Sequence, residues 1–261
     1  MAAPAIAHQE HGRGAAVVFL HGVGGGATCF APQLAAFGRR FRAIAWDMPG
    51  YSGSAALPEM TFPALADALA RLLDGLDVAA AHLVGHSMGG MVALEMMDRH
   101  AARVRSLSLV ATSPVFGSAD GAFQRAFLAE RLGPLDQGKT MPELAPTLVD
   151  GMFGDAPDPD GVARATAAMA AVPEATYRAS LQCLTTFDRR ALLGTIAVPT
   201  LVLAGSRDRA APAAGMERMA GRIPGARFVC LEGAGHLLPM ERPASFNDVV
   251  GTFLDTLPEV A

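Results

Sequence analysis

The chain has 261 residues, of which 51% are hydrophobic and 18% charged, and its formal net charge is −4 at pH 7. These values suit one sizeable domain, or one domain carrying an insertion, and they exclude a largely disordered chain. The basic residues are scattered and no apolar run approaches the ~20 residues of a membrane span, so we expect neither nucleic-acid binding nor a membrane protein. Three widely spaced cysteines and the lack of a signal-like N-terminal segment predict a reducing, cytoplasmic location.

The first part of the chain alternates short apolar runs with amphipathic segments. We expect an edge strand around Ile6 to His8, buried strands over 15–20 and 41–46, and helices over 30–37 and from Thr61 onward. The second helix is predicted from leucines that share one helical face, namely Leu65, Leu69, Leu72, Leu73 and Leu76. Alternating strands and helices predict a mostly parallel, doubly wound sheet with helices on both faces.

A Gly-x-Ser-x-Gly motif, Gly-His-Ser-Met-Gly, occupies residues 85–89. The apolar run 79–84 precedes it as a predicted strand, and a helix-like segment follows it to about residue 100. The motif therefore predicts a sharp strand-to-helix turn with Ser87 at its apex, where the glycines allow strand and helix to approach closely. The Ser87 hydroxyl would lie at the carboxyl edge of the sheet, and the amide of Met88 would point into the same space.

The glycine-rich loop 22–26 follows the strand predicted over 15–20. It lacks the Lys-Ser/Thr of a phosphate-binding loop, and its glycine spacing is not that of dinucleotide-binding proteins. We interpret it as the second half of an oxyanion hole, in which the amide of Val23 turns inward beside that of Met88. One such donor is typically worth ~3 kcal/mol in the transition state. His21 is expected to hold this loop in place, and Asp47, before a Pro-Gly turn, to accept a backbone hydrogen bond.

Residues 104–111 predict a further strand, after which the character of the sequence changes. Between 113 and 195 short amphipathic helices are predicted, separated by prolines at 134, 142, 157, 159 and 173, with a surface loop over 155–161. Strands resume at 198–204 and 227–231, and a helix is predicted over 243–257. We therefore divide the chain into a core, residues 1–112 and 196–261, and a helical cap, residues 113–195.

Asp208 and His236 each follow a predicted strand, as Ser87 does, so all three lie at one edge of the predicted sheet. A serine hydroxyl needs a nearby base to become a nucleophile, and an imidazole needs a carboxylate to fix its tautomer and stabilise its charge. The sequence therefore predicts a Ser87–Asp208–His236 triad. Asp188 and Asp120 are rival acids, but neither follows a predicted strand.

With these motifs the chain resembles the α/β-hydrolase fold family over nearly its whole length. Residues 21–26 look like the oxyanion loop of the family, and 85–90 look like its nucleophile elbow. Residues 47–54 are similar to its Asp-x-x-Gly-x-Gly-x-Ser segment, although Ser52 stands where many members have glycine. The resemblance implies an enzyme that needs no metal or cofactor. Within the family, the arrangement of motifs along this chain is most similar to that of 3-oxoadipate enol-lactonases and related small bacterial esterases.

We therefore expect a serine hydrolase that cleaves a small carboxylic ester or lactone. A homodimer is one oligomeric state that we consider for it. Two alternatives remain open: a carbon–carbon bond hydrolase of aromatic degradation, and a ligand receptor on the same fold with negligible turnover. An anionic substrate would require a cation in the cap. The candidates there are Arg125, Arg131, Lys139, Arg164 and Arg178.

Overall fold

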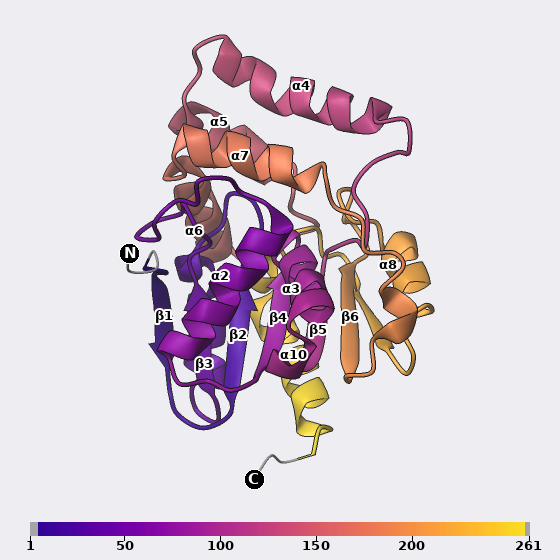
Figure 1. Cartoon of the computed structure of the whole chain (residues 1–261). Coiled ribbons are helices and arrows are strands. Elements are labelled where there is room, and N and C mark those ends of the chain that lie inside the picture. Colours follow the sequence, from indigo (N-terminus) through magenta and orange to yellow (C-terminus); the bar gives the residue numbers. More distant parts are fainter. Residues whose placement is uncertain (1–4, 259–261) are drawn as a thin grey trace.

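A computed structural model describes residues 5–258 of the chain. Its centre is one seven-stranded sheet in the order β1-β3-β2-β4-β5-β6-β7, in which only β1 runs antiparallel to its neighbour (Figure 1). The strands are β1 (His8–His11), β2 (Ala16–Leu20), β3 (Arg42–Trp46), β4 (Ala81–His86), β5 (Val104–Val110), β6 (Thr200–Gly205) and β7 (Arg227–Leu231). The predicted α/β class with a mostly parallel sheet is thus confirmed.

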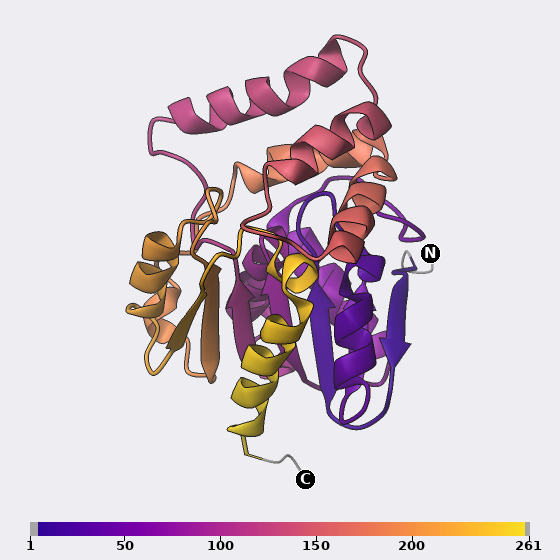
Figure 2. The same cartoon turned by 180° about the vertical axis from the view of Figure 1, so that it is seen from behind.

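Helices cover both faces of this sheet because the strand residues are apolar on both sides. In β2, Val18 and Leu20 pack against α2 (Phe62–Gly75) and α3 (Met88–Arg99), whereas Val17 and Phe19 pack against α1 (Ala31–Phe37) and α10 (Pro243–Asp255). Figures 1 and 2 show these two helical layers from opposite sides. Two short helices complete the core, α8 (Ala213–Ala220) and α9 (Leu238–Glu241).

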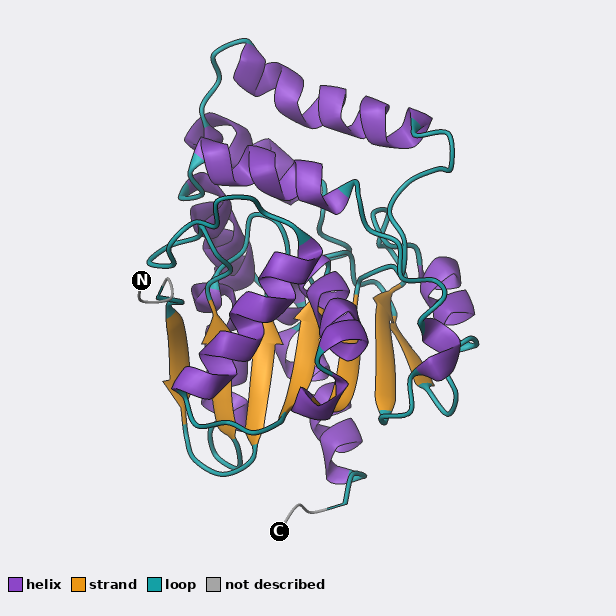
Figure 3. Ribbon diagram, in the orientation of Figure 1, coloured by secondary structure: helices purple, strands orange, loops and turns teal. Residues whose placement is uncertain are grey.

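The segment 113–195, which we call the cap, lies above the ends of the parallel strands (Figure 3). Its helices are α4 (Ala122–Asp136), α5 (Met141–Asp150), α6 (Pro159–Ala170) and α7 (Glu174–Leu184). The entry and exit of the cap pair with each other: the N–H of Phe116 donates to the carbonyl of Phe187, and Val115 forms a β-bridge with Asp188. The cap is therefore joined to the core by two chain segments that lie side by side.

Three local expectations were wrong. The edge strand spans His8–His11 and not residues 6–8, because its mostly exposed polar residues pair through their backbone with β3 and give no apolar pattern. Pro134 lies in the last turn of α4 and does not separate helices. Residues 159–161 belong to the first turn of α6, where Pro159 is tolerated because the first N–H groups need no helical acceptor. Within residues 5–258 no helix is long and apolar enough to cross a bilayer.

Candidate active site

Ser87 occupies the sharp turn between β4 and α3. Its backbone angles, φ 53° and ψ −121°, are strained for a residue with a side chain. Two hydrogen bonds stabilise this strained conformation. The N–H of Ser87 donates to the carbonyl of Val110 over 2.9 Å, and the hydroxyl of Thr112 donates to the carbonyl of Ser87 over 2.7 Å. The motif glycines are needed for close approach: a Cβ on Gly85 would lie 2.5 Å from the carbonyl oxygen of Gly89. The turn thus presents the serine hydroxyl above the sheet edge.

His236 and Asp208 lie beside Ser87 on neighbouring loops. The Nε2 atom of His236 is 2.9 Å from the Oγ atom of Ser87, and Nδ1 is 2.8 Å from Oδ2 of Asp208. Burial alone would raise the pKa of Asp208, but the hydrogen bond and charge of His236, with the N–H groups of Ala210 and Ala211, lower it below its usual value. Asp208 therefore stays ionised and can orient the imidazole with Nε2 facing the serine.

Two backbone N–H groups close to Ser87 in the chain or in space have no hydrogen-bond acceptor within residues 5–258. Met88 is the first residue of α3, so its N–H has no acceptor within the helix. The N–H of Val23 donates to no acceptor within residues 5–258. Gly22, just before Val23, lies against the serine, since a Cβ on Gly22 would be 3.2 Å from Oγ of Ser87. These two amides are the groups expected to form the oxyanion hole.

The loop that carries Val23 is held by two buried side chains. The ring of His21 bonds the carbonyl of Gly22 through Nδ1 and accepts the N–H of Met48 through Nε2 over 2.9 Å. Burial lowers the pKa of His21 to about 4, so the ring is neutral and can accept this bond. At the other end of the loop, Oδ1 of Asp47 accepts the N–H of Ala27 over 2.8 Å. Both residues have the structural contacts expected from the sequence.

A narrow cavity of about 20 Å³ opens beside this loop, between the core and the cap. Two neutral histidines and apolar or glycine residues form its wall, which contains no charged side chain. The residues are His21, Gly22, Val23, Gly24, Gly25, Cys29, Phe30, His86, Val149, Met152, Ala165, Met169, Leu237, Pro239 and Met240. Burial raises the pKa of Cys29 to about 11, so this thiol is not a nucleophile near neutral pH. The lining of this cavity suits an uncharged, apolar group, and it includes neither Ser87 nor His236.

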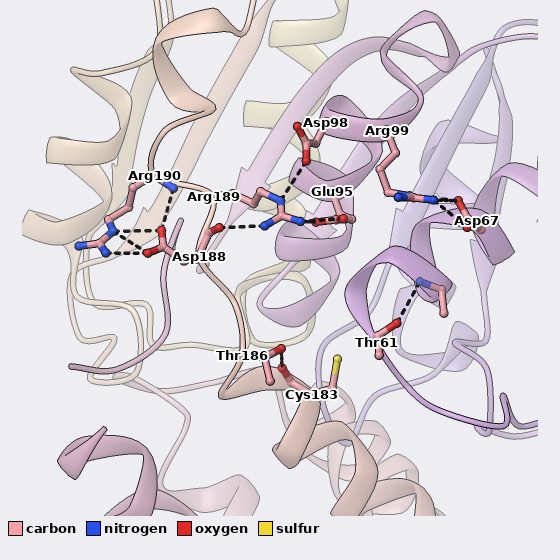
Figure 4. Close-up of polar contacts among 11 residues, drawn as sticks. Thr61, Asp67, Glu95, Asp98, Arg99, Cys183, Thr186, Asp188, Arg189 and Arg190 are labelled. Atoms are coloured by element: carbon pink, nitrogen blue, oxygen red, sulfur yellow. Dashed lines mark hydrogen bonds and ion pairs between the residues drawn. The ribbon is translucent and has the colours of Figure 1, made fainter. Parts of the chain in front are cut away.

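The rival acids lie elsewhere. Asp188 is bound to Arg190 in the exit segment of the cap (Figure 4), and Asp120 accepts hydrogen bonds from its neighbours before α4. None of the five cap cations considered above lines this cavity, but Arg164 lines a wider and more open pocket of about 350 Å³ beside Gly25 and Gly26. Arg178 pairs with Asp136 and Glu174. No group of three or more His, Cys, Asp or Glu side chains in residues 5–258 is placed to hold a metal ion.

Two buried residues that contact this site, His86 and Glu241, were assigned no role from the sequence. The Nε2–H of His86 donates to the carbonyl of His236 over 2.7 Å, and burial lowers the pKa of His86 to about 3. Glu241 accepts the N–H of Gly235, next to His236, over 2.6 Å. His86 lies inside the serine motif, whereas no pattern in the sequence marked Glu241.

Comparison with known proteins decides the family. The family model described as "Alpha/beta hydrolase family" matches residues 17–249. The chain belongs to the alpha/beta hydrolase family. This alpha/beta hydrolase is 29% identical over 245 residues to 3-oxoadipate enol-lactonase 1 of Acinetobacter baylyi, covering 93% of this chain and 89% of that protein.

Two solved structures resemble this alpha/beta hydrolase along almost its full length. A thermophilic esterase from Thermogutta terrifontis has a TM-score of 0.86 at 28% identity, covering 97% of this chain and 93% of that one. The enol-lactonase from Burkholderia xenovorans LB400 has a TM-score of 0.84 at 28% identity, covering 97% of each chain. The family and fold expected from the sequence are therefore confirmed.

Proposed function

We propose that this protein is a serine hydrolase that cleaves a small carboxylic ester or lactone through an acyl-enzyme on Ser87. The observation that carries the proposal is the hydrogen-bonded chain from Ser87 Oγ to His236 (2.9 Å) and from His236 to Asp208 (2.8 Å). A neutral imidazole between a hydroxyl and an ionised carboxylate is suited to take the hydroxyl proton. Similarity to an esterase and to enol-lactonases supports carbonyl chemistry of this kind.

The reaction follows from the positions of these groups. Ser87 Oγ attacks the substrate carbonyl carbon as its proton passes to Nε2 of His236, and Asp208 stabilises the imidazolium. The negative charge that develops on the carbonyl oxygen is stabilised by the N–H groups of Val23 and Met88. His236 then protonates the leaving alkoxide as the carbon–oxygen bond breaks. A water molecule, deprotonated by His236, attacks the acyl carbon; the bond to Ser87 Oγ breaks, Oγ takes the proton from His236 and the acid is released, with no metal or cofactor required.

The lining of the cavity bears on the substrate. An enol-lactone that carries a carboxylate would need a cation close to the carbonyl, because an unpaired buried charge is costly. No charged residue lines the cavity next to Gly22 and Val23. Within the ester and lactone class, we therefore propose a substrate whose group in this cavity is neutral and apolar.

The first test is a time course of p-nitrophenyl acetate hydrolysis by the wild type and Ser87→Ala. We expect sustained turnover by the wild type and a fall in kcat on the order of 10⁴-fold or more in the variant. Ser245→Ala, an exposed serine on α10, is the matched control and should keep wild-type rates. Turnover that survives in Ser87→Ala contradicts the proposed nucleophile.

This time course and a parallel one with a vinylogous diketone distinguish the alternatives. Release of one p-nitrophenolate per protein without further turnover would indicate a reactive serine with failed deacylation, as expected for a receptor. The narrow, apolar cavity is the feature that favours this second candidate. Turnover of a vinylogous diketone, with ester turnover absent, would instead identify a carbon–carbon bond hydrolase.

A further inference from the structure

The carboxylate of Glu241 connects the cap to the loop that carries His236. Glu241 ends the short helix α9 and is 1% exposed. Its Oε1 atom accepts the N–H of Gly235 over 2.6 Å, and its Oε2 atom accepts the N–H of Gly154 over 2.9 Å. Gly235 immediately precedes His236, whereas Gly154 lies in the cap between α5 and α6. One buried side chain thus bonds both segments, and the proposed reaction uses none of its atoms.

These two segments also contact each other through their backbones. The N–H of His236 donates to the carbonyl of Met152 over 2.7 Å. Three residues farther along the cap, the N–H of Asp155 donates to the carbonyl of Gly233, also over 2.7 Å. A Cβ on Gly154 would lie 2.2 Å from the carbonyl oxygen of Gly233, so the segments touch without side chains between them. The position of His236 therefore depends directly on that of cap residues 152–155.

On the side away from the cap, the loop that carries His236 packs against the loop that carries Asp208. A Cβ on Gly205 would lie 2.3 Å from the carbonyl oxygen of Gly235, and the N–H of Arg207 donates to Ala234 over 2.8 Å. The His236 loop is thus enclosed between the Asp208 loop and the cap. The core side of this enclosure is continuous with the sheet through β6 and β7. Its cap side depends on the hydrogen bonds described above, of which Glu241 makes two.

We propose that Glu241 is a positioning residue that couples the cap to the base: it holds His236 in line with Ser87 only while cap residues 152–155 are seated. This inference rests on the proposed function, because it assigns His236 the role of base. Glu241 acts through the backbone of Gly235 and touches neither Ser87 nor the cavity. A buried carboxylate between two N–H groups suits this task, since each oxygen accepts one bond and removing either bond leaves a buried polar group unpaired.

Displacement of cap residues 152–155 should therefore reduce proton transfer even though the three proposed catalytic side chains are unchanged. A misplacement of reacting groups by about 1 Å can cost about 10²-fold in rate. A substrate or inhibitor that shifts the loop between α5 and α6 would have the same effect. The cap then regulates the site as well as enclosing it.

The test compares Glu241→Gln with Glu232→Gln, which alters an exposed glutamate in the same loop. In Glu241→Gln the amide NH₂ faces one of the two N–H groups, so one hydrogen bond is lost. We expect kcat for p-nitrophenyl acetate to fall about 10²-fold with KM little changed. We also expect the acidic limb of the kcat/KM–pH profile to shift, because the charge of Glu241 faces Asp208 and Arg242. Glu232→Gln should leave both properties at wild-type values.

A second variant tests the coupling from the cap side and remains informative if Glu241→Gln does not fold. Gly154→Ala places a Cβ against the carbonyl of Gly233 and should lower kcat in the same way, whereas Gly151→Ala, whose Cβ would meet only Thr147 oxygen at 3.8 Å, should not. Wild-type kcat and pH profile in folded Glu241→Gln or in Gly154→Ala would overturn the inference while leaving the proposed function intact. Absence of wild-type turnover would overturn the proposed function and, with it, this inference.

Discussion

A Cβ atom on Gly22 would lie 2.7 Å from the Cβ atom of Ser87, closer than carbon atoms approach in folded proteins. The loop that carries the Val23 amide can therefore come this close to the serine only if residue 22 is glycine. The spacing between the proposed nucleophile and one proposed oxyanion donor thus depends on a missing side chain.

We predict that Gly22→Ala lowers kcat for p-nitrophenyl acetate by about 10²-fold, because the added methyl group moves the Val23 amide away from the developing oxyanion. Steady-state kinetics at saturating substrate would measure the effect. Gly251→Ala in α10, where the new Cβ would meet no atom within 4 Å, serves as the control. Equal kcat in both variants would show that Gly22 does not set this spacing.

Met169 limits the size of the cavity beside the loop 22–26. Its Cε atom lies where a Cβ on Gly24 would be 2.2 Å away, and the residue is 3% exposed. We predict that Met169→Ala raises the ratio of kcat/KM for the butyrate ester to that for the acetate ester by roughly 10-fold, since each buried methylene contributes about 0.8 kcal/mol.

Met169→Ala and the wild type are compared by hydrolysis of the two p-nitrophenyl esters, with urea unfolding measured alongside. Truncation should also destabilise the protein by roughly 2–5 kcal/mol, as is usual for a buried methionine. Met219→Ala, in α8 and equally buried, should cause the loss of stability without the change in ester preference. A ratio that stays at the wild-type value would exclude Met169 from the substrate cavity.

Three buried histidines, His21, His82 and His86, have lowered pKa values, and two of them line the cavity beside the loop 22–26. Burial lowers the pKa of His21 to about 4 and that of His86 to about 3, against 6.5 as the ordinary value. Between these values the unfolded chain binds more protons than the folded one. The contribution of both histidines is therefore fully present above pH ~6.5 and is lost as the pH falls, by about 2 kcal/mol for each at pH ~5.

This loss can be measured from urea unfolding curves recorded between pH 7.5 and pH 4.5. His86→Gln should give a shallower dependence of the unfolding free energy on pH than the wild type. His11→Gln, in the exposed edge strand β1, should leave the dependence unchanged. A wild-type slope in His86→Gln would mean that His86 does not resist protonation in the folded state.

The sequence predicted the layers of the fold because strand and helix alternate with clear apolar periods. The strand over 227–231 was placed with its observed bounds, and the loops of Ser87, Asp208 and His236 were placed at one sheet edge because parallel strands share their carboxyl ends. The edge strand β1 was misplaced because its residues are polar and its partner, β3, lies about 30 residues away in the chain.

The contacts of Glu241 and His86 could not be predicted from the sequence. Both side chains act on backbone groups of segments distant in the chain: His86 bonds the carbonyl of His236, and Glu241 bonds the N–H of Gly154. Local secondary-structure propensity and hydrophobic periodicity carry no information about such contacts. The contacts depend on how the cap packs against the folded sheet. The roles of Ser87, Asp208, His236 and the two amides remain predictions.

The entry and exit of the cap pair with each other beside β5 and β6, and Arg189 fixes the exit by an ion pair with the buried Glu95 on α3 (Figure 4). The two ends of the segment 113–195 therefore meet at one short β-bridge. A chain that lost the whole insertion would need only a tight turn to rejoin the sheet. Another lid could therefore be joined to the core at these two ends alone, but it would also have to supply the backbone contacts that residues 152–155 make with the loop of His236.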